Sequence, residues 1–230
     1  MKWLHARLPR LEMPFTIMSN AHTLIDELVG DLKAVRPLRQ SQGFAIALAS
    51  AGMGLFAMIG LFGMRPDLAA GRFDPGHMIA SGLFLMLAIA STANVLMMSH
   101  PRVGAVHTGG VWPAARIALL PIAALLFAFS RGSDLLARET VAHGLACFMI
   151  VGGSASTVLA ALVWWLRRGA PTSPERAGLL SGLASGSFGI FTFSLYCPEN
   201  DIVHIWLWHS STLAIAAVAG RLIVPLLVRW

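Results

Sequence analysis

The chain has 230 residues, of which 56% are hydrophobic and only 12% charged, and its formal net charge is +6. Soluble domains carry about 25% charged residues, so this composition excludes an ordinary soluble domain and indicates a protein that crosses a membrane several times. Basic residues beside membrane helices usually reflect topology, and we expect no direct binding to nucleic acid. Two cysteines without a CxxC motif exclude a disulfide-rich scaffold and a four-thiolate zinc site.

The first segment is polar and contains one amphipathic pattern. Residues 1–17 form an extension whose scattered apolar residues suit a disordered segment, and residues 18–42 form a cytosolic arm. Ser19 or Asn20 can cap a helix in this arm, and Pro37 would end it. Apolar residues recur there at helical spacing: Ala21, Leu24, Ile25, Leu28, Val29, Leu32 and Val35. The polar face is acidic, whereas helices that lie on membranes are usually basic, so we expect this helix to bind a protein partner.

Six apolar runs follow, and each is long enough to cross the hydrocarbon layer of a membrane. They cover residues 43–64, 78–98, 112–130, 140–166, 177–197 and 203–228. Arg116 and Arg221 lie within a few turns of helix ends, where long side chains can reach the lipid interface. The sequence therefore predicts an all-α polytopic membrane domain over residues 43–230, with six transmembrane helices surrounded by lipid.

Two further patterns concern topology and packing. If the N-terminus is cytosolic, 13 of the 17 Lys and Arg residues fall on the cytosolic side, as the positive-inside rule requires. Both termini are then cytosolic, and the loop that begins at Cys197 faces outward. In the fifth span, Gly178, Gly182 and Gly186 recur every four residues, a spacing that predicts close helix packing.

Cys147 in the fourth span and Cys197 at the end of the fifth are predicted to lie at one depth. Cys147 is 20 residues from Arg167, and Cys197 is 21 residues from Arg176, which is roughly 30 Å along a helix in both cases. Other polar residues gather near this level: His143, Glu199, Asp201, His204 and His209.

Several chemistries suit this cluster. Thiolates with imidazole and carboxylate groups suit zinc-like, cadmium-like or copper-like ions, which would bind transiently, and no resident cofactor is required. The two thiols can instead form a disulfide in an oxidising compartment. Buried cysteines can also serve as small apolar packing residues. The residues alone leave these alternatives open.

The motifs LIDELVGDLKAVRPL (24–38) and CPENDIVHIWLWHSS (197–211), with six spans and one cysteine in the fourth, resemble the NrsF-type family of bacterial inner-membrane anti-sigma factors, the negative regulators of sigma-F. The resemblance covers about residues 18–230. It implies a protein, not an enzyme, that holds an extracytoplasmic-function sigma factor at the inner membrane and releases it under heavy-metal or oxidative stress. The family's paired cysteines correspond to Cys147 and Cys197.

On this interpretation, one set of arm residues binds the sigma factor: Leu24, Ile25, Leu28, Val29, Leu32 and Val35. The rival interpretation is a small membrane thiol oxidoreductase or metal transporter. Against it, the chain has no CxxC or HExxH motif, and no Asp, Glu or Lys lies deep in a predicted span.

Overall fold

The computed structural model of the protein describes residues 15–30, 38–100, 138–197 and 204–228. All regular elements within these residues are helices, as the composition predicts. The chain divides into two units between Pro37 and Leu38. The predicted third span, residues 112–130 with Arg116, lies outside the described residues.

The first unit contains helix α1 (Phe15–Gly30). Ser19 and Asn20 lie inside this helix, so neither is its N-cap, contrary to the sequence prediction. The four residues before Ser19 contain no glycine or proline that would disfavour helix, and the helix therefore starts earlier than the capping residues indicate. The two last residues of the predicted apolar stripe, Leu32 and Val35, lie outside the described part of the chain.

The second unit is a helical bundle. Its elements are α2 (Gln40–Phe62), α3 (Pro66–Ala69), α4 (Pro75–Met98), α7 (Arg138–Leu166), α8 (Pro174–Ser194), the π-helical segment η1 (Ile205–His209) and α10 (Ser210–Leu227). Five described helices are long and apolar enough to cross a membrane, and they coincide with five of the six predicted spans to within a few residues. The chain is therefore a membrane protein.

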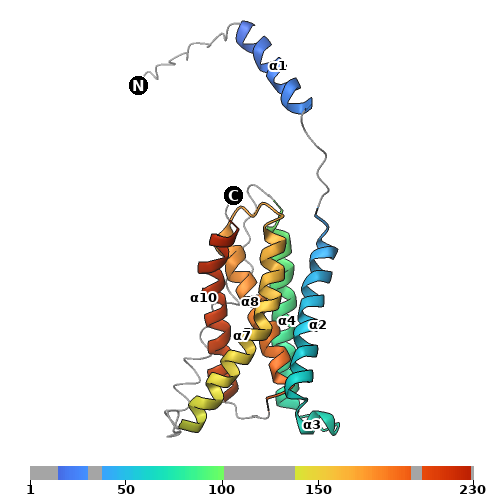
Figure 1. Ribbon diagram of the computed structural model, residues 1–230, viewed down its shortest axis with the longest axis vertical. Coiled ribbons are helices and arrows are strands. Elements are labelled where there is room, and N and C mark those ends of the chain that lie inside the picture. Colours follow the sequence, from blue (N-terminus) through green and yellow to red (C-terminus); the bar gives the residue numbers. More distant parts are fainter. Residues whose placement is uncertain (1–14, 31–37, 101–137, 198–203, 229–230) are drawn as a thin grey trace, which may run out of the picture. The chain divides into compact units, whose positions relative to one another are not determined.

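Helix α8 forms the centre of this bundle. Helices α4, α7 and α10 pack against it, and α2 packs mainly against α7 (Figure 1). Within the bundle, 89% of the α8 span is buried, against 22–33% of the other four spans. Because those four helices keep wide apolar faces outside the bundle, lipid can cover them, whereas α8 is surrounded by protein.

The glycines of α8 bring its backbone against that of α10. A Cβ atom added to Gly182 would collide with the carbonyl oxygen of Ala216, and one added to Gly178 would collide with that of Gly220. Small residues at four-residue spacing permit this kind of close approach in membranes. The predicted close packing of the fifth span is thus confirmed, and α10 is its partner.

Candidate functional site

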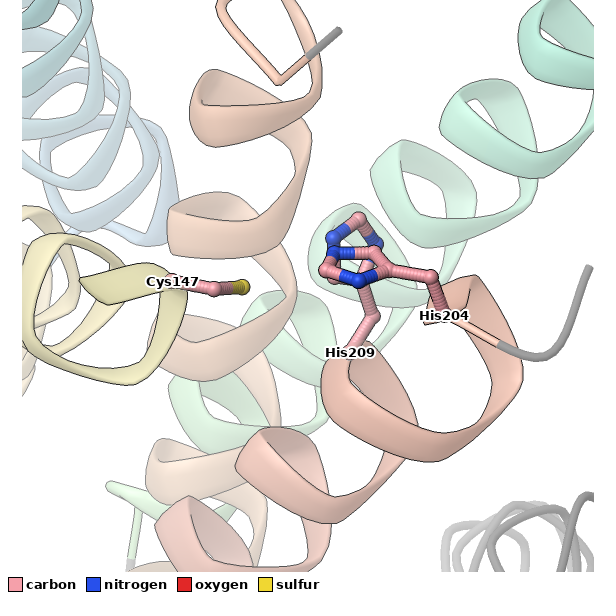
Figure 2. Close-up of side chains that lie close together, drawn as sticks. All are labelled: Cys147, His204 and His209. Carbon is pink, nitrogen blue, oxygen red and sulfur yellow. The ribbon is translucent and has the colours of Figure 1, made fainter. Parts of the chain in front are cut away.

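Three of the predicted site residues meet at one end of the bundle. One donor atom from each of Cys147, His204 and His209 lies within 4.8 Å of the other two. The Cys147 sulfur extends from α7 toward the two imidazole rings, which belong to η1 and the residue before it (Figure 2). Cys147 is 1% exposed and His209 is 3% exposed. The fourth and sixth predicted spans therefore contribute to one buried cluster.

The second cysteine joins the same cluster from α8. Cys197 follows the end of that helix, and its backbone N–H donates to the carbonyl of Phe193 at 2.9 Å, which holds the residue against the last turn. Its Sγ lies 3.9 Å from Nε2 of His204, and the side chain is buried. Cys147 thus lies near both imidazoles, and Cys197 lies near His204 and borders a small cavity together with His209. We call these four residues the thiol–imidazole cluster: Cys147, Cys197, His204 and His209.

The π-helical segment η1 explains how His204 and His209 come together. In an α-helix, residues five positions apart point roughly 140° away from each other, because one turn takes 3.6 residues. A π-helix has i→i+5 hydrogen bonds, so residues at this spacing fall on one side. The two rings here lie edge to face with centroids 5.7 Å apart. The local change in helix type therefore creates the imidazole pair.

Contacts on both sides fix η1 in place. The indole ring of Trp208 lies directly against Gly144 of α7, where a Cβ atom would collide with the ring. The imidazole of His209 packs edge-on against the aromatic rings of Phe84 and Phe193, at centroid distances of 6.3 and 5.8 Å. Gly144 precedes Cys147 by three residues and so lies on the same face of α7. This packing explains why the sixth span reaches Cys147 at this point.

His209 has an unusual environment for a buried polar group. Among the described residues, its Nε2 is a buried nitrogen without a hydrogen-bond partner, although most buried polar atoms have one. The ring borders a cavity of about 10 Å³ whose walls also include His77, Ser81, Ser194 and Cys197. A space of this size accommodates about one water molecule, or one ion. The unsatisfied nitrogen and the cavity make this the strongest candidate for a binding site in the described bundle.

Sequence reasoning missed two residues beside the cluster, His77 and Arg65. His77 lies in the first turn of α4, and its ring receives a hydrogen bond from buried Arg65. Arg65 also pairs with Asp67 at 2.6 Å, and this guanidinium holds the pKa of Asp67 below its ordinary value. Arg65 lies only a few residues beyond the first predicted span, where basic residues are usually exposed, and the one sequence feature that could have pointed to a buried pair is the acid two positions later.

Three predicted auxiliary residues are not placed by the structure. Glu199 and Asp201 lie outside the described residues, and only the backbone of His143, in α7, is described. Their roles remain predictions. In α1, the structure describes four of the six predicted sigma-binding residues, and all four are exposed: Leu24, Ile25, Leu28 and Val29.

The donor set suits a soft or borderline metal ion. Thiolate and imidazole are the usual ligands of zinc and copper ions. A tetrahedral zinc ion, with bonds of about 2.0–2.3 Å, would place its ligand atoms roughly 3.3–3.8 Å apart. The present spacing of up to 4.8 Å requires the side chains to close by about 1 Å around an ion. Cys147 and Cys197 are both free thiols.

Comparison with known proteins adds the family. A family model described as NrsF, negative regulator of sigma F, matches residues 28–230. A protein named probable anti-sigma-F factor NrsF from Azospira oryzae is 27% identical over 211 residues, which cover 90% of this chain and 98% of that protein. The anti-sigma-F factor NrsF of Caulobacter vibrioides is 28% identical over 214 residues, with the same coverage. No solved structure was found to match. The chain therefore belongs to the NrsF family.

Proposed function

We propose that this protein is a membrane-bound anti-sigma factor that holds an extracytoplasmic-function sigma factor at the bacterial inner membrane and releases it under heavy-metal or oxidative stress. The observation that carries the proposal is the family match over residues 28–230, together with two relatives that are named anti-sigma-F factors. The protein acts by binding and release, so no catalytic residue is assigned.

The apolar side chains of α1 support this helix as the sigma-binding segment. Leu24, Ile25, Leu28 and Val29 are 53–61% exposed, and their spacing places them on one side of the helix. Asp26 and Glu27 are also exposed and lie outside this stripe. Amphipathic helices commonly place such a stripe in an apolar groove of a partner protein. We therefore assign this stripe to the sigma factor, with Leu32 and Val35 as its continuation.

Co-purification tests the role of the arm. The tagged full-length protein is expressed with its sigma factor, membranes are solubilised, and the retained sigma factor is quantified. Leu24→Asp with Leu28→Asp should abolish retention, because two carboxylates would have to be buried against an apolar groove. Thr23→Asp, on the opposite side of α1, is the matched control and should retain the partner. Full retention by the double variant would disprove the role of this helix.

Topology completes the proposal. With 13 of 17 basic residues on the cytosolic side, both termini are cytosolic and the thiol–imidazole cluster lies near the outer face. The arm is then accessible to a cytosolic sigma factor, while the cluster can meet ions or oxidants that arrive from outside. Reporter fusions at residue 230 and in the loop after Cys197 should report opposite sides of the membrane.

The position of both Cys147 and Cys197 near His204 supports a shared sensing unit. Loss of either thiol should then have the same effect as loss of both, because coupled residues are non-additive. Release of the sigma factor by cadmium or by an oxidant would be measured for Cys147→Ser, Cys197→Ser and the double variant. Normal responses of both single variants would identify the cysteines as packing residues, and purely additive effects would mean that each thiol acts alone.

Because both thiols are buried in the folded bundle, the experiment that distinguishes a disulfide from a bound metal ion must begin with unfolding. Alkylation is performed after unfolding in detergent. A disulfide survives this treatment and blocks alkylation until a reductant is added, whereas thiols that held a metal ion react at once. Equilibrium dialysis of the folded protein then measures the bound metal directly, with the Cys147→Ser variant as control.

A further inference from the structure

Arg65 is a buried charge at the same end of the bundle as the thiol–imidazole cluster. It lies between α2 and α3 and is only 3% exposed. Its Nε and Nη2 atoms donate to the two carboxylate oxygens of Asp67 at 2.6 and 2.7 Å. Asp67 also accepts from the backbone N–H of Leu68 at 2.9 Å. A buried guanidinium needs such partners, because an unpaired charge in this position would be strongly destabilising.

The remaining contacts of Arg65 join three helices. Its Nη1 donates to Nδ1 of His77 at 3.0 Å, in the first turn of α4; since a guanidinium can only donate, Nδ1 accepts. Its backbone N–H donates to the carbonyl of Leu195 at 3.0 Å, directly after α8. Asp74 caps α4 by accepting from the backbone N–H of His77 at 2.8 Å. Arg65 therefore ties the end of α2 to the start of α4 and the end of α8.

These contacts lead directly to the cluster. Leu195 is two residues from Cys197, and the backbone N–H of Cys197 bonds to the last turn of the same helix. His77 forms one wall of the small cavity that Cys197 and His209 also border. A movement of Cys197 or of His209 would therefore act on Leu195 and on His77, two residues that Arg65 contacts.

Helix α2 connects this end of the bundle with the arm. Near its beginning, Gly43 lies tightly against the side chains of Leu96 and Trp165, and the chain before Gln40 continues to α1. Contacts at its two ends thus hold a helix of 23 residues, about 34 Å long. If the contact at Arg65 changes, α2 can tilt about Gly43, which reorients the first turn of α2 at Gln40.

We propose that Arg65 is a positioning residue that couples the thiol–imidazole cluster to α2, and through α2 to the sigma-binding arm. This proposal rests on the proposed function. When an ion or a bond draws Cys147, Cys197 and the imidazoles together, the end of α8 and the first turn of α4 shift, and Arg65 transmits the shift to α2. Asp67 keeps the guanidinium in place and His77 is its link to the cavity.

The test compares cadmium binding with its effect on the partner. Full-length protein in lipid nanodiscs is titrated with cadmium alone, and the affinity for the sigma factor is measured with and without the ion. In the wild type, cadmium should lower this affinity by roughly 5–150-fold, the usual range for coupled sites. In Arg65→Gln and Arg65→Lys, this ratio should fall several-fold toward 1. Neither side chain can bind both carboxylate oxygens of Asp67 and also reach His77, whereas the backbone bond to Leu195 remains.

Two further measurements separate coupling from a merely structural role. Both variants should bind cadmium, and should bind the sigma factor without cadmium, within about threefold of the wild type, since Arg65 touches neither ligand. Arg72→Gln removes an exposed arginine from the same connection and should keep the full cadmium effect. An unchanged ratio in the Arg65 variants overturns the proposal, and so does a loss of cadmium binding or of metal-free sigma binding.

Hydrogen exchange of α2 tests the coupling without the sigma factor. In the wild type, cadmium should change exchange in peptides that cover residues 56–65, and in Arg65→Gln this change should be strongly reduced. If α2 of the wild type does not respond to cadmium, the coupling is wrong. If α2 responds but the sigma factor does not bind or is not released, the proposed function is wrong while the coupling between cluster and helix stands.

Discussion

Replacing Gly182 by alanine tests whether the backbone contact between α8 and α10 organises the bundle. The new Cβ atom would lie 2.9 Å from the Cα atom of Ala217 and would also collide with the carbonyl of Ala216. Carbon atoms ordinarily approach to about 3.5–4.0 Å, so α10 must move away by roughly 0.6–1.1 Å. Backbone atoms cannot rotate aside, and overpacking of this kind costs about 1–3 kcal/mol.

Two other glycines supply the controls. Gly152 in α7 has no neighbour within 4 Å of an added Cβ atom, so Gly152→Ala should have only the effect of changing glycine to alanine in a helix. A Cβ atom added to Gly186 would lie 2.9 Å from Cβ of Ala216 and 3.2 Å from Cδ1 of Leu213, a flexible side chain, and would not collide with a backbone carbonyl as one at Gly182 would. The expected order of destabilisation is Gly182→Ala, then Gly186→Ala, then Gly152→Ala.

Detergent-induced unfolding in bicelles, followed by tryptophan fluorescence, measures these free energies of unfolding. Because α10 continues directly from η1, displacement of α10 in Gly182→Ala should also weaken cadmium binding at the cluster. Equal stability of Gly182→Ala and Gly152→Ala would refute the reasoning, since the packing contact would then contribute nothing measurable.

Two further predictions follow from the packing around the cluster. Gly144→Val should push Trp208 away from α7 and weaken cadmium binding by about 10–100-fold, as expected when groups that orient metal ligands are lost. Gly152→Val in the same helix is the control. Equal cadmium affinities of the two variants in equilibrium dialysis would contradict the role of the contact between Gly144 and Trp208. The pKa of Asp67 is lower in the folded protein than its ordinary value of 3.8. Ionised Asp67 therefore stabilises the folded state at pH values above 3.8, and this stabilisation is lost as the pH falls through the lowered pKa. Asp67→Asn should therefore reduce the pH dependence of stability below about pH 4, measured by unfolding at pH 3 to 6, and an unchanged profile would show that the pair with Arg65 is not linked to folding.

Much of the helical framework could be predicted from the sequence. Long apolar runs bounded by charged loops predicted five described helices, and four-residue glycine spacing predicted the close approach of α8 to a neighbour. Counting residues from Arg167 and Arg176 placed Cys147 and Cys197 at one depth, and the structure brings both thiols near His204. These features depend on helix rise and on residue size, which are local properties.

Other features depend on contacts that sequence spacing does not specify. The edge-to-face pair of His204 and His209 requires the π-helical segment η1, whereas α-helical spacing would separate them. The burial of Arg65 requires three helix ends to lie next to one another, and a single sequence does not show which helix ends are neighbours. The start of α1 at Phe15 was missed because capping residues are equally compatible with a position inside a helix.

The central position of α8 has a consequence for how the protein is assembled. It is the least hydrophobic of the five described spans and the one most enclosed by protein. A helix of this kind gains little from lipid alone, because its small and hydroxyl-bearing residues are suited to contact with other helices. Stable insertion of α8 should therefore depend on α7, which precedes it, and on α10, which is synthesised after it. The helix that carries Cys197 would then reach its final position only once the last span has entered the membrane, so that truncated chains lack a finished cluster.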